Sequence, residues 1–530
     1  MAIDIKATLE DIARMQTATG NSPRPGSVEL SQCIIQHGDE NYYDISSLVH
    51  EIHFFEDIEQ LGVSGWIQIK DNINLIRNGL ILGEELLWLR FETAGATDSG
   101  HPEFAVDYSS RTPLYIHKIE EIVSPITNQG TTSQLWLEYR LHFCSTEIIT
   151  NDRVRLSKAY QGRISDIVLD VMKKELGVIK KPITVTQTED IHHFISPNLR
   201  PLDFILSIVD KARIQDFQPV VGPQLAAADS LFRGDFLHDV VFFETAHRPV
   251  ATDGGWFLIP LQRSAFADLI FTLNNAATTT GAEDSEVVAD IRGYPAAMMR
   301  SLSYEFITTG DKWSTISDGS WAGSEIQHND FYKSFDVFKS DYLKHLNENK
   351  YSHASKTPVF WPPDPSWRTI SEWPDSKLSF KSGSSKYFSN INTSTRLAAY
   401  PWTGESRDHK LLQELQINHM LNYERIRCEM YGISGLQVGK MVEAVFPSIG
   451  RGSGSEYETG IVGSVDVYGE DRNNNTWMIT KVGHHLMFRG SDTTYTSTME
   501  LSNTMRNTKK ELPVYGSLSG AAPGRSNAGR

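Results

Sequence analysis

The chain of 530 residues is poor in cysteine. It has only three, Cys33, Cys144 and Cys428, which lie more than a hundred residues apart and share no CxxC spacing. An odd number of widely spaced cysteines argues against a disulfide framework. We therefore expect all three to be small apolar residues of a protein made in a reducing compartment.

Long apolar runs are also missing, because charged residues interrupt every hydrophobic stretch, so no membrane span is expected. The first residues, MAIDIKATLEDIARM, place acids among the apolar side chains and lack a basic start. This pattern is unlike a secretory signal. The protein is expected to fold and to be used where it is made.

A basic excess is lacking as well: 50 Lys and Arg residues stand against 66 Asp and Glu, a formal net charge of −16. A protein that grips nucleic acid needs the opposite balance, so the composition argues against a DNA-binding enzyme. At 40% hydrophobic and 10% aromatic, the chain can bury several cores. Its length suggests about three or four domains.

Motifs that carry enzyme chemistry are absent. GLQVGKM (435–441) has three residues between its glycines and Met441 after the lysine, whereas a phosphate loop needs four residues and a Ser or Thr. No GxSxG nucleophile elbow occurs. Asp466, Glu470 and Asp471 lie beside a polar loop, which does not suit the cleft of a glycosidase dyad. We expect no catalytic residues and no cofactor.

Two histidine pairs, His192-His193 and His484-His485, are the nearest approach to a metal motif. Adjacent residues of a strand point to opposite faces, so neither pair can chelate from one side. No HExxH motif supplies further ligands. The sequence therefore predicts no metal site.

What the sequence does contain is alternation with a period of two. In residues 86–92 and 134–144, and again in 495–501, apolar or small residues alternate with polar ones, which predicts strands with one buried face. Asn78-Gly79 is a candidate turn between two strands. DVVFFET and GGWFLIPL predict a further pair of strands.

Helical spacing is confined to the middle of the chain. Ile164, Ile167, Val168, Val171, Met172 and Leu176 share one helix face, and Gly177 is placed to end the helix. A second helix should begin near Pro201 and bury Leu202, Ile205, Leu206 and Val209. The sequence thus predicts a β-rich α+β chain of several domains.

The chain divides into seven parts by these patterns. We expect an N-terminal arm (1–27), a strand-rich domain (28–145), a small α/β insert (146–215), a mixed β domain (216–350) with an exposed loop at 273–286, an irregular wrapping segment (351–408), a second strand-rich domain (409–512) and a flexible tail (513–530). The wrapping segment is rich in Pro, Ser and aromatics, and ordering it in a lone chain is costly, which favours contact with another subunit.

Three blocks of the sequence, in order, resemble one family. The first block carries an acidic strand, a Ser-Gly, an "I-x-I-x-D" strand and a "G-E-E" turn, at Glu56, Ile58, Ser64, Gly65, Ile67, Ile69, Asp71, Gly83, Glu84 and Glu85. The middle block runs from YRLHFCSTEIITNDRVRLSKAYQGRISDIVLDVMKKELG through NLRPLDFILSIVDKA to VVFFETAHRPVATDGGWFLIPL. The last block carries Gly432, Leu436, Gly439, Val442, Pro447, Val482, His484, Tyr495, Ser497, Glu500 and Leu501, with Lys440 and Ser497 departing mildly from the usual pattern.

In the order and spacing of these blocks across about 450 residues, the chain resembles the baseplate central hub proteins of T-even-type contractile phages. That family is related to the N-terminal part of type VI secretion spike proteins. The resemblance implies that 28–145 and 409–512 are two tube-like β-barrel domains. Three chains would then present six such units in a pseudo-sixfold ring.

The resemblance also implies function, partners and place. A homotrimeric, non-catalytic hub would join the threefold central spike to the sixfold tail tube or a tube-initiator protein, contact the baseplate wedge proteins, and pass phage DNA through its lumen without specific binding. It would be a virion component assembled in the host bacterial cytoplasm. Two hypotheses follow for the acidic residues: they line the lumen so that DNA slides, or they face bulk solvent for solubility.

Interfaces of obligate assemblies bury on the order of 2,000–5,000 Å², which would suit the wrapping segment. We expect the barrel-to-barrel contacts at two strands, represented by Leu87, Leu89 and Phe91 and by Tyr495, Ser497 and Met499. Three alternatives stay open: a spike-complex component of a secretion or contractile injection system, a tail-associated peptidoglycan hydrolase, and a carbohydrate-binding receptor protein at the tail tip.

Overall fold

The computed structural model describes a set of segments between Gly26 and Asn503, and every structural statement below concerns them. They are residues 26–38, 41–95, 105–109, 112–123, 136–188, 191–209, 212, 214–215, 236–237, 240–246, 254–260, 269–274, 301–308, 322–329, 334–341, 386–391, 424–445, 476–489 and 492–503. The expected arm, exposed loop, wrapping segment and tail lie wholly or mostly outside these residues, and the domain boundaries stay predictions.

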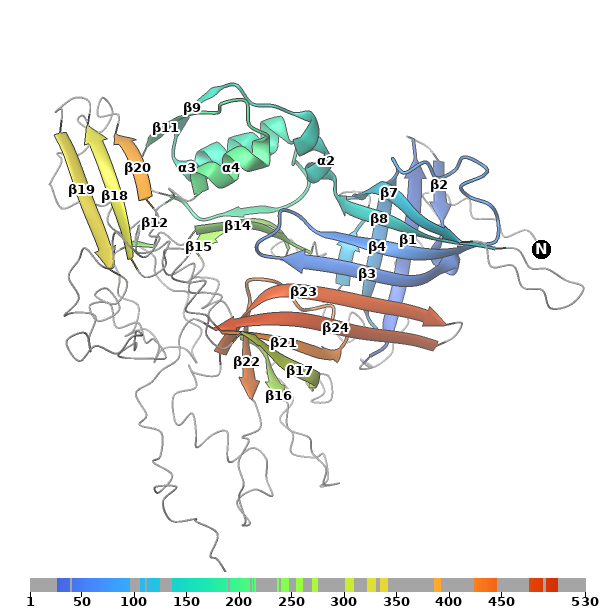
Figure 1. The fold of residues 1–530 in the computed structure, drawn as a ribbon. Coiled ribbons are helices and arrows are strands. Elements are labelled where there is room, and N and C mark those ends of the chain that lie inside the picture. The colour runs from blue at the N-terminus through green and yellow to red at the C-terminus, as the bar shows by residue number, and fades with distance from the viewer. Residues whose placement is uncertain are drawn as a thin grey trace, which may run out of the picture.

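One large sheet contains strands from both ends of the chain (Figure 1). Its strand order is β17 (Ser301–Thr308), β21 (Glu424–Tyr431), β24 (Asp492–Asn503), β23 (Thr476–Arg489), β3 (Val49–Asp57), β4 (Ser64–Asp71), β8 (Leu137–Ser145), β7 (Leu114–Val123), β5 (Leu86–Thr93), β1 (Val28–His37) and β2 (Asn41–Asp44). Three more strands join it: β6 (Ala105–Tyr108) pairs with β5, β22 (Met441–Val445) with β23, and β16 (Leu269–Asn274) with β22. All neighbours are antiparallel except β16 and β22.

The β-rich, multidomain fold class is confirmed, and its sheet has an unexpected form. Two separate barrels were expected, but the described strands form one open path that ends at β17 and β2, with no closed barrel among them. Pairing between β3 and β23 merges the two ends of the chain. Barrels whose borders are completed by neighbouring copies stay a prediction.

Alternation predicted strand faces well where one side of the sheet is polar. On β8, Tyr139, Leu141 and Phe143 are buried, and on β24 the same holds for Tyr495, Ser497, Met499 and Leu501. On β5 the prediction of a single buried face is wrong, because Trp88 and Glu92 are buried as well. The outer side of β5 is covered: the Trp88 ring packs on Tyr42, and its indole N–H donates to Gln36 Oε1 at 3.2 Å.

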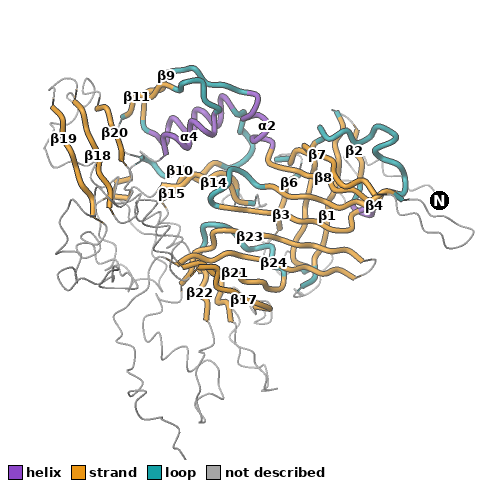
Figure 2. The backbone as a smooth tube through the Cα atoms, in the orientation of Figure 1, coloured by secondary structure: helices purple, strands orange, loops and turns teal. Residues whose placement is uncertain are grey.

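The middle of the chain contains helices and short strands, drawn above β14 (Val240–Thr245) in Figures 1 and 2; we call them the α/β unit, and its bounds as a domain stay a prediction. Its helices are α2 (Thr146–Arg153), α3 (Ile164–Asp170), which continues into the π-helical turn η3 (Val171–Glu175), and α4 (Pro201–Val209). All six apolar residues predicted for the first helix are buried. The second helix starts at Pro201 as predicted, but Leu206 is wrongly assigned to its buried face, being 41% exposed.

Small sheets complete the described structure. β14 pairs with β15 (Gly255–Pro260), as the sequence predicts, and β10 (Ile183–Val185) adds to β15 in parallel. The others are β9 (Ala159–Gly162) with β11 (His192–Ile195), β12 (Ile214–Gln215) with β13 (Phe236–Leu237), and β18 (Ala322–Asn329) with β19 (Ser334–Asp341) and β20 (Lys386–Ile391). The three-residue helix η1 (Ser46–Leu48) precedes β3. No described helix has the length and apolar character that a membrane crossing requires.

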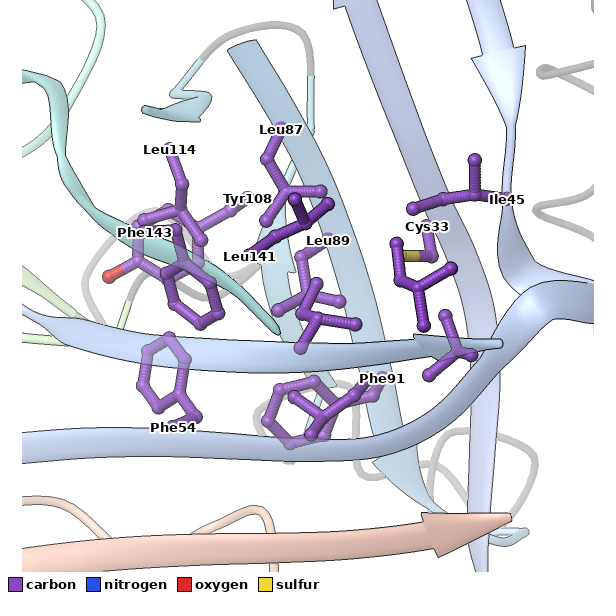
Figure 3. Packing of buried hydrophobic residues seen from close by; sticks show 14 of the residues in the cluster. Cys33, Ile45, Phe54, Leu87, Leu89, Phe91, Tyr108, Leu114, Leu141 and Phe143 are labelled. Carbon is purple, nitrogen blue, oxygen red and sulfur yellow. The ribbon is translucent and has the colours of Figure 1, made fainter. Parts of the chain in front are cut away.

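Three large apolar cores and a small cluster around Trp88 hold the described elements together. The largest lies inside the N-terminal strands, where Phe54, Phe91 and Phe143 pack closely (Figure 3), and it also takes in Leu486 and Tyr495 from the C-terminal strands. A second core fills the C-terminal strands, and a third lies between α3, α4 and the β14–β15 pair. The two ends of the chain therefore share a core as well as a sheet.

A buried charge cluster fixes the α/β unit to the N-terminal strands. Lys181 donates to Glu147 Oε2 at 2.8 Å and to Glu244 Oε1 at 2.6 Å, and all three side chains are almost fully buried. Ser145 and the Val63 amide also donate to Glu244, at 2.6 and 3.2 Å. Burial raises the pKa of the Glu244 carboxyl, although Lys181 opposes that shift.

Candidate functional site

The most informative part of the molecule is the sheet of eight strands from β17 to β7, in which β3 and β23 meet at the centre. We call β3, β4, β8 and β7 the N-terminal unit and β17, β21, β24 and β23 the C-terminal unit. In both units the strands that come first, second, third and fourth along the chain lie side by side in the order first, second, fourth, third. Because β23 and β3 are antiparallel, each strand of one unit runs in the same direction as the strand at the same place in the other unit. The two units therefore follow each other head to tail.

Both outer edges of this eight-stranded sheet are largely unpaired among the described strands. β17 pairs only with β21. β7 pairs with β8 along its length, but it meets β5 only at Leu114 and Tyr115. Apolar side chains are exposed at both edges: Leu302, Phe306 and Ile307 are 41–48% exposed on β17, and Val123 is 54% exposed on β7.

The core side of the junction is closed. The Tyr495 hydroxyl lies 2.9 Å from Nδ1 of His484, and Ser497 Oγ lies 3.3 Å from the same nitrogen. Ser497 also accepts the amide of Ile433 at 3.2 Å. This buried polar cluster orients strands of the C-terminal unit against the N-terminal core.

The residues predicted to mark subunit contacts all lie in that interior. Their exposed fractions are 0% for Leu87, Leu89, Phe91, Tyr495 and Ser497 and 1% for Met499. Figure 3 shows Leu87, Leu89 and Phe91 packed within the first core. These six side chains therefore contact their own chain, and a border between their strands and another copy stays a prediction.

The opposite side, which we call the polar face, carries the side chains that alternate away from the core. One row of residues across this face alternates in charge: Glu305, Arg427, Glu500, Lys481 and Asp57. Arg427 lies 2.8 Å from Glu305 and 2.9 Å from Glu500, measured between nitrogen and oxygen. Lys481 lies 2.9 Å from Asp57. Hydrogen bonds from Arg427 and the nearby bases outweigh the effect of burial and lower the pKa of Glu500.

The charges of the polar face nearly cancel. Its described acids are Glu51, Asp57, Glu120, Glu138, Glu305, Glu429, Asp492 and Glu500, and its described bases are Lys70, Lys118, Arg140, Arg425, Arg427, Lys481 and Arg489. Eight acids against seven bases leave one negative charge, whereas the whole chain carries −16. An acid-lined surface is not what these strands present.

A second row places aromatic rings and histidines side by side at the junction. His485 of β23 lies opposite His53 of β3, which lies opposite Trp66 of β4. His53 stacks on both neighbours, with ring centroids 4.1 Å from His485 and 3.9 Å from Trp66. The Arg140 guanidinium lies 4.5 Å from the centre of the Trp66 ring.

Glu51 joins the two histidines. Its Oε1 lies 2.8 Å from Nε2 of His53 and 2.7 Å from Nε2 of His485. Burial alone would raise the pKa of Glu51, but the bonds from the histidines outweigh burial and lower it. Burial also lowers the pKa of His53, although Glu51 opposes that shift.

This cluster was missed by the sequence reasoning. The prediction that His484 and His485 point to opposite faces is confirmed, since His484 is fully buried and His485 lies on the polar face. The other two members of the cluster lie more than 400 residues away in the chain. Glu51 and His53 alternate on one strand, but nothing local identifies His485 as their neighbour.

Residues that carry the family resemblance have structural roles. Asp71 accepts the amides of Ile73 and Leu75 at 2.9 and 2.7 Å, and Glu85 accepts three consecutive backbone amides at 2.6–3.0 Å. At Gly65 a Cβ atom would lie 2.1 Å from the carbonyl oxygen of His53. Gly439 lies in a turn before β22, as predicted in place of a phosphate loop.

Comparisons with known proteins give distant matches. No protein-family model and no curated protein matches the sequence. The tail protein from Neisseria meningitidis MC58 matches with a TM-score of 0.43 and 9% identity, over 89% of this chain and 96% of that chain. The 43 kDa tail protein of prophage MuSo2 from Shewanella oneidensis matches with a TM-score of 0.40 and 6% identity, over 89% and 97%.

A third solved structure is the E. coli c3393 protein, described as a component of the type VI secretion system with structural similarity to T4 bacteriophage tail proteins gp27 and gp5. It matches with a TM-score of 0.37 and 9% identity, over 89% of this chain and 76% of that chain. Because all three TM-scores lie below 0.5, we base the function on the geometry of this chain.

Proposed function

We propose that the chain is a ring-forming structural subunit of a contractile phage tail, the hub of its baseplate, and that it works as a homotrimer without catalytic activity. One observation carries the ring: the two units repeat the same strand order, head to tail, within one chain. A contact already made once inside the chain is available to be made again between chains.

The strand polarity supports this repetition. β23 ends the C-terminal unit and pairs antiparallel with β3, the first strand of the N-terminal unit. β7 occupies the position of β23 in the other unit, and β17 occupies the position of β3. Antiparallel pairing of β7 with β17 of the next copy would therefore reproduce the internal junction, and such a heterologous contact closes into a ring when the rotation fits.

Three copies of an eight-stranded sheet would give six units and twenty-four strands around one lumen. The number three comes from the resemblance to the hub family, as do the spike, tube and wedge partners and the place in the virion. Edge strands with exposed apolar side chains invite aggregation unless another strand covers them. Ring closure would cover both edges.

The polar face would then line the lumen. Its charges pair with each other and nearly cancel, so it would offer DNA neither a basic surface that binds phosphates nor a strongly repelling one. This arrangement suits passage without specific binding, by charge balance in place of the acidic lining that composition suggested.

The test is the mass of the full-length particle, measured by light scattering alone and with the adjacent spike protein. The chain has a mass of 59.6 kDa, so a trimer would have three times that mass. Phe306→Lys on β17 should abolish the trimer, because position 306 lies opposite the buried Ile426 and a lysine there would be desolvated beside apolar side chains. Val123→Pro on β7 should abolish it as well, because a proline at the edge cannot donate a backbone hydrogen bond to the strand of the next copy. Ile195→Lys, at an exposed position on β11, is the matched control and should keep it.

A monomer under both conditions would overturn the proposal, and so would a trimer that both edge variants leave intact. We also expect no release of peptidoglycan fragments by the purified protein, which separates the hub from a muralytic enzyme.

A further inference from the structure

We propose that Glu51, His53 and His485 form a binding site for a divalent transition metal ion of the zinc type at the junction of the two units. The proposal adds to the ring and does not depend on it, because all three residues belong to one chain. It rests on where the strands place the side chains and on the chemistry of the three donor groups.

The sheet brings the three side chains together from opposite ends of the chain. Glu51 and His53 are two residues apart on β3, so they share a face. His485 lies directly opposite His53 on β23. Antiparallel pairing holds opposite Cβ atoms about 4.5–5.5 Å apart, so the backbone fixes the separation of these groups before any ligand arrives.

The donor atoms are within reach of one ion. One ligand atom from each residue, an imidazole nitrogen from each histidine and a carboxylate oxygen from Glu51, lies within 4.8 Å of the others. Two histidines and one glutamate are a donor set that zinc accepts, with the remaining position open to water. With metal–ligand bonds of about 2.0–2.1 Å, tetrahedral geometry separates the ligands by about 3.3 Å. The present 2.7 and 2.8 Å contacts would therefore widen by roughly half an ångström.

Metal binding needs an ionised carboxylate and neutral imidazoles, so Zn²⁺ affinity should fall in acid. Nε2 of each histidine now lies against Glu51. When Nε2 binds the metal, the imidazole ring carries its proton on Nδ1 instead, and this change of tautomer releases no proton to solvent.

The surroundings limit the site and also stabilise it. His53 is held between the rings of His485 and Trp66, which restricts its rotation. The Arg140 guanidinium lies over the Trp66 ring, and its charge opposes a bound cation. All three ligands are partly exposed, so water can reach the open position.

A metal ion here would join β3 to β23 across the only described backbone pairing between the two units. Binding to the folded chain alone would raise its stability by mass action. The expected effect is a clamp on the junction, with one ion per chain.

The experiment uses the full chain, untagged and stripped with a chelator, titrated with Zn²⁺ by calorimetry and with Co²⁺ by visible absorption. We expect one ion per chain, a tetrahedral Co²⁺ spectrum, and a higher melting temperature with Zn²⁺. His485→Gln should weaken Zn²⁺ binding at least tenfold and remove the rise in melting temperature. His142→Gln is the matched control, since His142 lies on the same face and contacts Glu120 at 2.8 Å.

Glu51→Gln is a second variant that keeps a neutral hydrogen-bond acceptor beside the histidines, so it tests the site if His485→Gln does not fold. It should also weaken Zn²⁺ binding at least tenfold. Absence of stoichiometric binding by the unmodified chain would overturn the proposal. Equal losses in the control and in either ligand variant would overturn it as well. None of these results depends on whether the chain is a trimer.

Discussion

Replacing Lys181 with methionine tests the buried charge cluster, because it removes the one cation from between two buried carboxylates. Lys181 is 3% exposed at its side chain, Glu147 is 7% exposed and Glu244 is 0% exposed. Methionine fills a similar volume without charge. The variant must either keep two buried anions together or take up a proton.

The expected loss of stability follows from the free energy of protonating Glu244 in the folded variant. In the unfolded chain Glu244 has a pKa near 4.5, so holding it neutral in the folded state at pH 7 costs about 3.4 kcal/mol, at 1.36 kcal/mol per pH unit. This agrees with the roughly 3–5 kcal/mol lost when one partner of a buried ion pair is removed. At pH 5.5 the same reasoning gives about 1.4 kcal/mol, so about 2 kcal/mol should return on acidification.

The direction of the Glu244 pKa shift decides whether stability rises or falls with pH. A carboxyl whose folded pKa lies above its unfolded value stabilises the protein most below the unfolded value, and this stability is lost as the pH rises through the folded value. Lys181→Met should therefore be least stable, relative to the unmodified protein, at neutral pH and above. The double variant Lys181→Met, Glu244→Gln should lose this pH dependence, since an amide does not titrate.

The assay is equilibrium urea unfolding followed by circular dichroism at pH 7 and pH 5.5. Lys174→Met is the control in the same unit, because the Lys174–Asp170 pair is screened by solvent and its removal should leave the unfolding free energy nearly unchanged at both pH values. A loss below about 1 kcal/mol for Lys181→Met at pH 7 would refute the reasoning, as would a loss that is the same at both pH values.

Four further predictions follow from individual contacts. Gly432→Ala should cost about 3 kcal/mol in urea unfolding, because its Cβ would lie 2.0 Å from the Tyr495 ring. Glu85→Ala should cost about 3 kcal/mol in the same assay, since three backbone amides lose a charged acceptor, and Glu85→Gln should cost less. Glu51 has a folded pKa below 4.5, so it contributes stability above that pH and loses it as the pH falls through the folded pKa; Glu51→Gln should flatten the stability profile there. The three cysteine thiols are buried with raised pKa values, so a thiol reagent should modify them only after unfolding.

Local patterns predicted local structure. The start of α4 at Pro201 and the one-sided burial of β24 follow from residue spacing, because each depends on neighbours within one turn or one strand. Leu206 was assigned wrongly to the buried face because its exposure depends on contacts beyond its own helix. Helical spacing gives the relative positions of side chains, but the width of the covered face depends on what packs against it.

Contacts between distant segments could not be read from the sequence. The alternation on β5 predicts one solvent-exposed face, but side chains from β1 and β2 of the same sheet, among them Tyr42, cover Trp88. Nothing near Lys181 indicates that Glu244 will lie beside it, 63 residues later. The pairing of His53 with His485 is of the same kind, since strand register across such a separation is set by the whole fold.

The β3–β23 pairing also has a consequence in time. Translation proceeds at roughly 5–20 residues per second, so the approximately 420 residues between these strands take on the order of 20–80 s to synthesise. Throughout that interval β3 lacks the neighbour that will cover its edge, while β4 can already protect its other side. A chain released by a ribosome that stalls before residue 476 would therefore carry a sheet with an open edge at β3, and the synthesis of β23 ends this exposure.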